Sequence, residues 1–567
     1  MHLSLEAITR LFPFYLTRNK NYWKNQNVES ESLSLVFGPI QRMRKPICLI
    51  DQERCQKMGR VCGIYEGGKP TLMVADPDLL KQVLVKEFPS LPNRRDHQIE
   101  DPFLTNIMTL APVERWRKIR QLSTPAFSTA KLKKMNDLIQ DCARVSAKHL
   151  ANAAEEEKEL DVKQFYGHFA LDMIARCAFG TTLDSYTDAT NEFVTQARIA
   201  FAANITPLHM INVLLANFFK SRKPKTFNEG AFLYFKSICQ RIMKQRAETN
   251  ERKEDFLQLM IEAREGRLSQ CGDCTDEPGN GLNDDGAETM LKGTTNDKAM
   301  YKNQFEYLPG LAASTAAPSR KRAGSYCDRE DNDVYSLRVT ALTEDEALAQ
   351  CVLFFVGGQE TTASMVAFAA HLLAVHPEVQ DKLRREVDAC IAANGSEPSM
   401  DAVAKLKYLH CVVSETLRLY PTAPRLERSA VEDCVLGETG IKIRKGGMVT
   451  VPLYALHRDP EFFPEPDTFK PERFSEENVA SIMPYTYLPF GAGPRNCIGM
   501  RLGLHAIKVA LLHSVHKVRF VRAEKTQVPL KMATVFGAVT AEDMTCSNSK
   551  EDAINCIVTR KRKIGQP

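Results

Sequence analysis

A single cysteine in a glycine-rich loop constrains this chain more than any other feature of its 567 residues. Residues 490–499 read FGAGPRNCIG and place Cys497 two positions after an arginine, directly before a helical pattern that covers 500–513. Backbone N–H groups freed by Gly493 and Gly499, together with the start of that helix, would stabilise a negatively charged sulfur. The loop therefore suits a cysteine thiolate that is held as a metal ligand.

Three kinds of site could explain such a cysteine. A buried position behind a turn is the commonest one for an isolated cysteine, because free cysteine is among the most buried residue types. A thiolate zinc site would need further Cys or His partners, and none lies within the loop. A single thiolate on one side of a metal fits haem, whose porphyrin supplies four nitrogen ligands.

The loop resembles the signature of the cytochrome P450 superfamily, which is Phe, two variable residues, Gly, one variable residue, Arg, one variable residue, Cys, one variable residue and Gly. The fixed positions are here Phe490, Gly493, Arg495, Cys497 and Gly499. The resemblance implies a mainly α-helical fold with small β-sheets, a triangular helical prism around a buried haem b. Cys497 would be the axial ligand of the haem iron, with Phe490 and Gly491 against the cofactor.

A second pattern predicts one long helix. Thr343 with Glu346 three residues later makes a capping box, and helical periodicity then continues to about residue 376. Gly357 and Gly358 in its centre would each cost about 1 kcal/mol relative to alanine, so they need a reason. One reason is close packing of another element against a bare backbone. The other is a local widening of the helix beside a flat cofactor.

The resemblance extends to this helix, where Glu360 and Thr361 match the family's acid–alcohol pair for proton delivery. Leu353, Gly357 and Thr361 lie at i, i+4 and i+8, so they form one stripe that we expect to face the haem. A hydroxyl that relays protons, replenished by a nearby carboxylate, would serve an apolar pocket that bulk water does not reach. Gly357 is a departure, because alanine is commoner in the family.

Another motif predicts structural support for the cysteine loop. Glu415 and Arg418 lie at i and i+3 and share one helix face, and an ordinary surface pair of this kind contributes little stability. In this context the pair resembles the family's ExxR motif, which pairs with an arginine from a later loop, here Arg473. We expect a buried ionic triad, in which removal of Glu415 would leave two uncompensated arginines.

The two carboxylates of haem need cationic or N–H partners. Trp116 and Arg120 match the family's WxxxR motif, and Arg495 precedes the cysteine by two positions. The resemblance adds Arg94 and Arg428 as candidates. For these two arginines, a solvated surface position is the alternative.

Segments 255–261, 417–428 and 454–460 resemble the family-three animal enzymes of xenobiotic oxidation and their arthropod relatives. The resemblance implies a haem-thiolate monooxygenase that oxidises lipophilic small molecules (xenobiotics, steroids or lipids) with O2 and, indirectly, NADPH. A P450-fold peroxide isomerase and a non-catalytic haem-based ligand-binding protein are the alternatives, and the retained acid–alcohol pair disfavours the isomerase. The candidate pocket residues are mostly apolar: Leu353, Phe354, Val356, Gly357, Ala423, Phe536 and Ala538.

The resemblance also implies partners. NADPH–cytochrome P450 reductase would deliver electrons on the face behind Cys497, with cytochrome b5 as a second candidate donor. Arg117, Lys118, Lys133 and Lys134 are candidates for a basic docking patch, although a charge run is usually a solvated face. The implied location is the cytosolic face of the endoplasmic reticulum membrane. Sixteen cysteines without a disulfide spacing favour a reducing compartment, and a formal charge of +5 indicates no nucleic-acid partner.

Although 567 residues suggest several domains, the motifs must converge on one cofactor, which favours a single catalytic domain over 28–530. Within it, 265–340 has few large apolar residues and predicts an inserted disordered loop. Residues 1–27 lack about 18 consecutive apolar residues and have two interpretations. Either they are the remnant of a truncated membrane anchor, or attachment to the membrane relies on other surfaces. Residues 531–567 are interpreted as a strand-rich tail.

Two further segments have weaker signals. The apolar segment 205–219 predicts either a buried helix or a surface that dips into a membrane. Cys271 and Cys274 form a lone CxxC motif without a second pair, which gives little support to a zinc or redox site.

Overall fold

The computed structural model describes most of the chain. The described residues are 18–33, 45–66, 68–96, 101–156, 159–188, 191–201, 229–267, 341–524, 526–533, 539, 541 and 555–560. Outside them fall residues 1–17, the apolar segment 205–219, the CxxC motif, almost all of the predicted insertion, and the pocket candidates Phe536 and Ala538.

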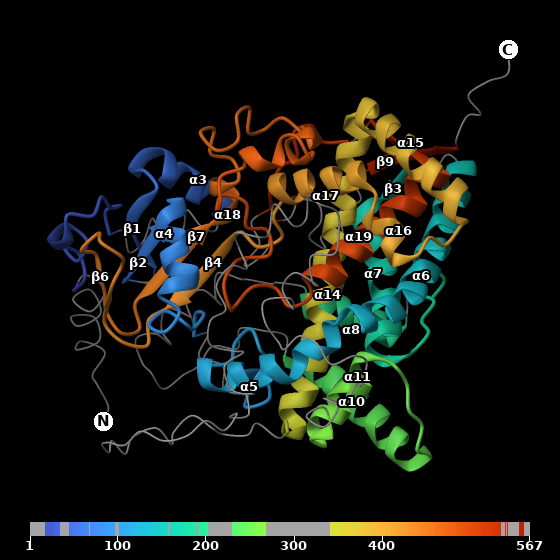
Figure 1. The fold of residues 1–567 in the computed structure, drawn as a ribbon, viewed down its shortest axis with the longest axis horizontal. Coiled ribbons are helices and arrows are strands. Elements are labelled where there is room, and N and C mark those ends of the chain that lie inside the picture. The colour runs from blue at the N-terminus through green and yellow to red at the C-terminus, as the bar shows by residue number, and fades with distance from the viewer. Residues whose placement is uncertain are drawn as a thin grey trace, which may run out of the picture.

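Helices dominate the described structure, and the expected mainly α-helical class with small β-sheets is confirmed (Figure 1). The α-helices are α3 (Ile47–Met58), α4 (Pro77–Lys81), α5 (Val113–Ser123), α6 (Thr129–Glu155), α7 (Val162–Phe179), α8 (Glu192–Phe201), α10 (Glu229–Thr249), α11 (Phe256–Arg264), α14 (Glu344–Val375), α15 (Pro377–Asn394), α16 (Met400–Ala404), α17 (Lys407–Leu419), α18 (Leu453–Leu456) and α19 (Met500–Lys517).

The strands form three small sheets. The largest has the order β1 (Val61–Glu66), β2 (Lys69–Val74), β7 (Met448–Pro452) and β4 (Arg425–Ser429), in which only the β2–β7 pair is parallel. A second sheet has the order β3 (Glu159–Asp161), β9 (Asn555–Arg560) and β8 (Val518–Arg522). The strands β5 (Cys434–Val435) and β6 (Lys442–Ile443) pair with each other. The hairpin β1–β2 begins the first sheet and is closed by the turn at Gly68, whose φ is 78°.

Helix α14 is the central element of the helical part. The predicted capping box is present, because Thr343 Oγ1 accepts a hydrogen bond from the Glu346 N–H and the Glu346 carboxylate accepts one from the Thr343 N–H. The helix ends at Val375, before Pro377. It packs against α7, α10, α11, α17 and α19. Among the described helices it alone is long and apolar enough to cross a bilayer, but its burial among these neighbours makes it a core helix.

The fold brings the first sheet and the helices together around the cysteine loop. In Figure 1 the sheet lies with α3 and α4 at one side of the molecule, and the helices around α14 and α19 lie at the other. Residues 490–499 run between the two parts directly before α19. Gly493 lies against the backbone of Leu84, which follows α4.

Candidate active site

The cysteine loop is a tight turn that requires its glycines. Gly491 and Gly493 have φ values of 72° and 70°, in the left-handed region that favours glycine. A Cβ added to Gly493 would lie 2.0 Å from the Leu84 carbonyl oxygen, so no other residue fits there. The Cys497 N–H donates to the Phe490 carbonyl over 2.9 Å and closes the loop. Cys497 is therefore held by backbone geometry three residues before α19 begins.

The Cys497 side chain faces open space although it lies deep in the protein. It is exposed, yet burial is the largest factor acting on its thiol and raises its pKa. The Gly499 backbone N–H, Arg120 and Arg94 act in the opposite direction and lower that pKa. The thiol is therefore accessible to a small group although protein atoms surround it. A metal ion bound there would displace the thiol proton, and the adjacent N–H and cations would stabilise the thiolate.

Four arginines lie near this cysteine with their positive charges poorly compensated; Arg428 and Arg495 are buried, and Arg94 and Arg120 are half-buried. Burial lowers the pKa of Arg94, of Arg120 to about 10, and of Arg428 and Arg495 to about 9. Repulsion by neighbouring arginines lowers the last three values further. Arg428 Nε has no hydrogen-bond partner among the described residues. Buried uncompensated cations need anionic partners, so the group fits a cofactor with two carboxylates such as haem b.

Arg495 differs from the other three arginines in the number of its backbone partners, because three carbonyls accept from it. Its Nε donates to the Pro92 oxygen over 2.9 Å, and its Nη atoms donate to the Met108 and Ala111 oxygens over 3.2 and 3.0 Å. The guanidinium also lies 4.4 Å from the ring centre of Trp116. Arg495 therefore ties the cysteine loop to the segment that leads into α5.

Two of the other arginines also hold the loop. Arg120 Nη1 and Nη2 donate to the backbone and side-chain oxygens of Asn496 over 3.0 and 2.9 Å. Arg94 Nη2 donates to the Arg495 carbonyl over 3.2 Å. The motif residues Trp116 and Arg120 thus reach the cysteine loop from α5, as their spacing in one helix turn allows.

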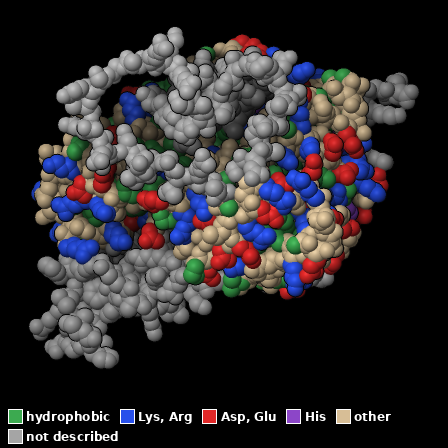
Figure 2. Space-filling model, turned by 60° about the horizontal axis from the view of Figure 1, so that its bottom comes forward, with side chains coloured by type: hydrophobic (Ala, Val, Ile, Leu, Met, Phe, Trp, Pro, Cys, Tyr) green, Lys and Arg blue, Asp and Glu red, His purple; other side chains and the backbone are tan. Residues whose placement is uncertain are grey.

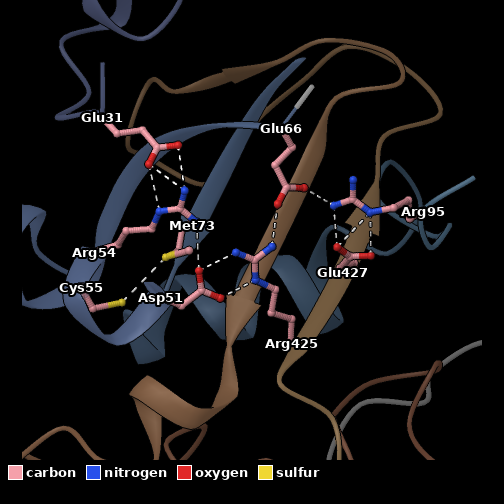
Figure 3. Close-up of polar contacts among 9 residues, drawn as sticks. All are labelled: Glu31, Asp51, Arg54, Cys55, Glu66, Met73, Arg95, Arg425 and Glu427. Atoms are coloured by element: carbon pink, nitrogen blue, oxygen red, sulfur yellow. Dashed lines mark hydrogen bonds and ion pairs between the residues drawn. The ribbon is translucent and has the colours of Figure 1, made fainter. Parts of the chain in front are cut away.

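Arg94 and Arg428 lie near each other because their chain neighbours form an ion pair. Arg95 Nε is 3.0 Å from both carboxylate oxygens of Glu427, and Ser429 N donates to the Asn93 carbonyl over 2.7 Å. This clamp joins the segment before α5 to β4 despite the repulsion between the two adjacent cations. It is one end of a mostly buried ionic chain that Figure 3 shows: Glu31, Arg54, Asp51, Arg425, Glu66, Arg95 and Glu427.

On α14, the predicted stripe is the part of the helix centre that stays open. Gly357 and Thr361 are exposed and Leu353 is half-buried. In the helix turns before Leu353 and after Thr361, the side chains are mostly buried. Thr361 Oγ1 donates to the Gly357 carbonyl over 2.7 Å. Phe354 does not share the stripe, because it lies 100° further round the helix and stacks on Phe256 at 4.4 Å.

Comparison with known proteins identifies the family to which the chain belongs. A family model described as cytochrome P450 matches residues 30–285 and 321–545. The chain is a cytochrome P450. Its relatives include cytochrome P450 3A14 of Cavia porcellus, 30% identical over 525 residues that cover 92% of this chain and 90% of the relative. Another is cytochrome P450 3A5 of Homo sapiens, 32% identical over 529 residues that cover 92% and 91%. The predicted likeness to family three is confirmed.

Family membership makes this P450 a monooxygenase with haem b as cofactor and O2 as co-substrate. The residues of the site fit that cofactor. An internal thiol can supply a thiolate ligand, and the buried arginines can compensate two carboxylates.

The acid of the acid–alcohol pair has a partner that the sequence did not reveal. Lys163, at the start of α7, forms an ion pair with Glu360 and also donates to Ser364. Ser364 Oγ donates to Glu360 Oε1 over 3.2 Å. The Lys163 side chain is only 11% exposed, so this pair is poorly screened by solvent. No local pattern predicts it, since 197 residues separate the two partners.

The two glycines of α14 have different surroundings, and each of the predicted reasons applies to one of them. A Cβ added to Gly358 would lie 2.4 Å from Ile174 Cδ1 of α7, which is close packing against a bare backbone. A Cβ added to Gly357 would meet only Leu353 Cδ1 at 4.0 Å, so Gly357 leaves open the side of the helix that carries Thr361.

The expected contacts of the ExxR motif are present and fully buried. Arg418 Nε and Nη2 donate to the two carboxylate oxygens of Glu415 over 2.7 and 2.8 Å, and both side chains are 0% exposed. Arg473 Nε lies 3.3 Å from Glu415 Oε1. The Lys470 N–H donates to the same oxygen over 2.9 Å. Glu415 therefore compensates two arginines at once.

A chain of hydrogen bonds leads from this triad to the cysteine loop. Arg418 Nη1 donates to the His457 carbonyl over 2.8 Å, and His457 Nε2 accepts from the Leu488 N–H over 2.9 Å. Burial and the nearby Arg418 lower the pKa of His457 to about 3, so the neutral imidazole acts as the acceptor. The Gly491 N–H donates to the Leu488 carbonyl over 3.0 Å.

The candidate docking lysines are paired rather than free. Lys118 contacts Glu346 at 2.8 Å, Lys133 contacts Asp401 at 2.8 Å, and Lys134 contacts Glu254 at 2.5 Å. Arg117 is exposed. On the face shown in Figure 2, basic and acidic side chains are intermixed over the described surface. The sequence pattern did not indicate these pairs, because each acid comes from a distant helix or loop.

The structure describes two further pocket candidates, Val356 and Ala423, and both are half-buried. The Val539 N–H donates to the Thr422 carbonyl over 3.1 Å, which brings the chain after residue 538 beside Ala423.

Proposed function

We propose that this P450 oxidises lipophilic small molecules, such as xenobiotics, steroids or lipids, with electrons that a reductase passes on from NADPH. The observation that carries the proposal is the Cys497 thiol, which is exposed beside two buried and two half-buried arginines. Similarity to the 3A enzymes over nine-tenths of the chain supports the substrate class and the electron source.

In this proposal Cys497 Sγ binds the haem iron, and Arg94, Arg120 and Arg428 pair with the haem carboxylates. Arg94 and Arg120 also hold the cysteine loop through their hydrogen bonds to it. Arg495 holds the loop alone, because three backbone oxygens already accept from its guanidinium. Bound haem supplies O2 binding and oxygen insertion.

Thr361 and Glu360 are the proposed proton-delivery residues. Thr361 Oγ1 would move protons to the open side of α14, and the Glu360 carboxylate would replenish them. The Thr361 hydroxyl now donates to the Gly357 carbonyl, and Lys163 holds Glu360. Proton delivery therefore requires the Thr361 hydroxyl to change its acceptor and Glu360 to release Lys163.

The open side of α14 is mostly apolar, which supports a lipophilic substrate. Leu353, Val356 and Ala423 offer hydrocarbon surface, and Gly357 adds space without adding polarity. Ligand sites of this kind take up apolar molecules and orient them with few polar groups.

The proposed partners are NADPH–cytochrome P450 reductase, cytochrome b5 and the cytosolic surface of the endoplasmic reticulum membrane. Arg117 is the exposed cation of the predicted docking patch. Lys133 and Lys134 are bound to acids in pairs that are half-exposed, and such pairs contribute at most about 1 kcal/mol. An acidic partner could therefore displace those acids at small cost.

Turnover under 18O2 tests the proposal. The purified P450 is incubated with reductase, NADPH and a steroid probe, and the products are analysed by mass spectrometry. We expect a product that contains one 18O atom and that requires NADPH. A hydroperoxide rearranged without NADPH would favour the isomerase. A haem spectral shift on probe binding without any product would favour the non-catalytic binding protein.

A further inference from the structure

Four sulfur-bearing side chains meet in a small cluster on the sheet side of the molecule, separate from the main hydrophobic core. Cys55 and Met58 come from α3, Cys62 from β1 and Met73 from β2. Together with Ile64 they form an apolar cluster of their own. The proposed oxidation chemistry uses none of them.

Two sulfurs of this cluster are in contact, and a third residue is paired with one of them. Cys55 Sγ lies 3.9 Å from Met73 Sδ, the contact drawn in Figure 3. Cys62 is the register partner of Met73 in the antiparallel β1–β2 pair. Residues directly opposite in such a pair have Cβ atoms about 4.5–5.5 Å apart. Both side chains are 0% exposed in the same cluster, so they lie on the same face of the hairpin.

This spacing matches a metal site with sulfur ligands. Metal–sulfur bonds are about 2.3 Å long, so two sulfurs that bind one ion in a trigonal arrangement are about 4.0 Å apart. The 3.9 Å between Cys55 Sγ and Met73 Sδ therefore needs almost no adjustment. Sulfur atoms that merely pack together also lie at this distance. The types of ligand atom present therefore decide which metal the cluster could bind.

We propose that Cys55, Cys62 and Met73 form a binding site for Cu(I), with Met58 as a fourth sulfur within the cluster. Thioether ligands favour Cu(I), whereas zinc sites use Cys, His and carboxylates. Binding releases one proton from each thiol, and the charges balance as one Cu⁺ and two thiols giving a dithiolate complex of charge −1 and two protons. Arg54 lies near Cys62 but is paired with Glu31 and Asp51, so the cluster itself must hold that charge.

The ligand atoms favour a soft metal. The three proposed ligands include a thioether, a donor that favours Cu(I) over zinc. Cys55 and Met58 are half-buried, so an ion can reach the cluster from the α3 side. Once bound, it would link α3 to the β1–β2 hairpin.

Titration of the holoprotein with Cu(I) alone tests the site. The parent protein carries Cys271→Ser and Cys274→Ser, so that the CxxC motif cannot bind the ion. Cu(I) is added without oxygen in competition with a chromogenic Cu(I) chelator, and the reduced carbon-monoxide spectrum is recorded throughout. We expect one Cu(I) per chain, at least tenfold weaker binding in Cys55→Ser and in Cys62→Ser, and several-fold weaker binding in Met73→Leu.

Cys239→Ser is the matched control, because Cys239 is also a buried thiol next to a second cysteine, Cys351. We expect its Cu(I) affinity to equal that of the parent. Thermal unfolding is the second readout, in which Cu(I) raises the Tm of the parent and of Cys239→Ser but not of Cys55→Ser. Unchanged affinity in a Cys55→Ser/Cys62→Ser variant would overturn the proposal. So would an absence of Cu(I) binding, or a Cys55–Cys62 disulfide found by mass spectrometry.

Discussion

The guanidinium of Arg428 is the most costly group of the haem site when no carboxylate accompanies it. It is 2% exposed, Nε has no hydrogen-bond partner among the described residues, and Arg94 and Arg495 repel it. Arg428 stays in this position despite the repulsion because the Arg95–Glu427 ion pair fixes the neighbouring backbone. In the proposed site, a haem carboxylate beside Arg428 would offset this cost.

The variant Arg428→Met should stabilise the apoprotein and weaken haem binding. Because its pKa is lowered from 12.5 to about 9, we expect removal of the charge to raise the free energy of unfolding by roughly 2–4 kcal/mol at pH 7. The unfolded state binds more protons than the folded state between about pH 9 and 12.5. The free energy of unfolding of the wild-type protein therefore rises as the pH increases over that range. The difference in stability between Arg428→Met and the wild-type protein should narrow.

Urea unfolding of the haem-free proteins at pH 7 and pH 10 measures this effect, and haem transfer from the holoproteins measures the loss of affinity. Equal destabilisation of the apo and holo forms would contradict the charge argument.

The variant Lys163→Met should release the Glu360 carboxylate from its ion pair. Since Lys163 approaches both Glu360 and Ser364, we expect a several-fold change in product formed per NADPH consumed, together with an altered solvent isotope effect. The haem spectrum should stay unchanged. Ser364→Ala keeps the ion pair and is the control. A parallel loss of haem and activity in Lys163→Met would indicate a purely structural role.

Among the elements, α17 shows how burial converts a common sequence pair into a structural one. Glu415 and Arg418 are 0% exposed, whereas Asp141 and Arg144 have the same i, i+3 spacing on α6 but side chains that are 44% and 57% exposed. The two pairs share their spacing along the helix and differ in solvent exposure, so their contributions to stability can be compared.

Glu415→Gln should lower the free energy of unfolding by about 3–5 kcal/mol, because it leaves Arg418 and Arg473 without a buried counter-charge. Asp141→Asn, the exposed counterpart, should cost less than about 1 kcal/mol. Thermal or urea unfolding of the two holoproteins decides the matter. Comparable losses in the free energy of unfolding for both variants would mean that burial does not increase the contribution of the triad to stability.

Features with short-range causes were predictable from the sequence, and features with long-range causes were not. The capping box at Thr343 depends on residues three apart, and the helix stripe with Gly357 and Thr361 follows from helical periodicity. The Lys163–Glu360 pair depends on how α7 packs against α14, which no local pattern encodes. The same limit applies to Phe354, whose stacking on Phe256 removes it from the open side of the helix.

The roles of the two central glycines also required the packing of α7. Sequence reasoning offered both close packing and a widened helix for the pair. The neighbour Ile174 distinguishes Gly358 from Gly357, and it lies in a helix almost 200 residues earlier.

At the scale of the whole molecule, the two ends of the segment between α11 and α14 lie next to each other in the fold. The Leu342 N–H donates to the Ala263 carbonyl over 3.0 Å, so the two ends of the segment are adjacent. Loop-closure entropy changes slowly with length, so replacing residues 268–340 by a short Gly-Ser linker should be tolerated. We expect normal haem content and a Tm within a few degrees of the full chain. A deletion protein without haem would show that these residues are needed by the catalytic domain predicted for 28–530.

The thiolate ligand is the central claim, and the absorption spectrum of the reduced, carbon-monoxide-bound protein tests it most directly. Cys497 is exposed, the loop glycines fix its position, and nearby N–H and guanidinium groups stabilise a negative sulfur. We predict the red-shifted band of a haem thiolate in the wild-type protein and its loss in both Cys497→Ser and Cys497→His. A band that persists in either variant, or a wild-type protein without it, would contradict the account.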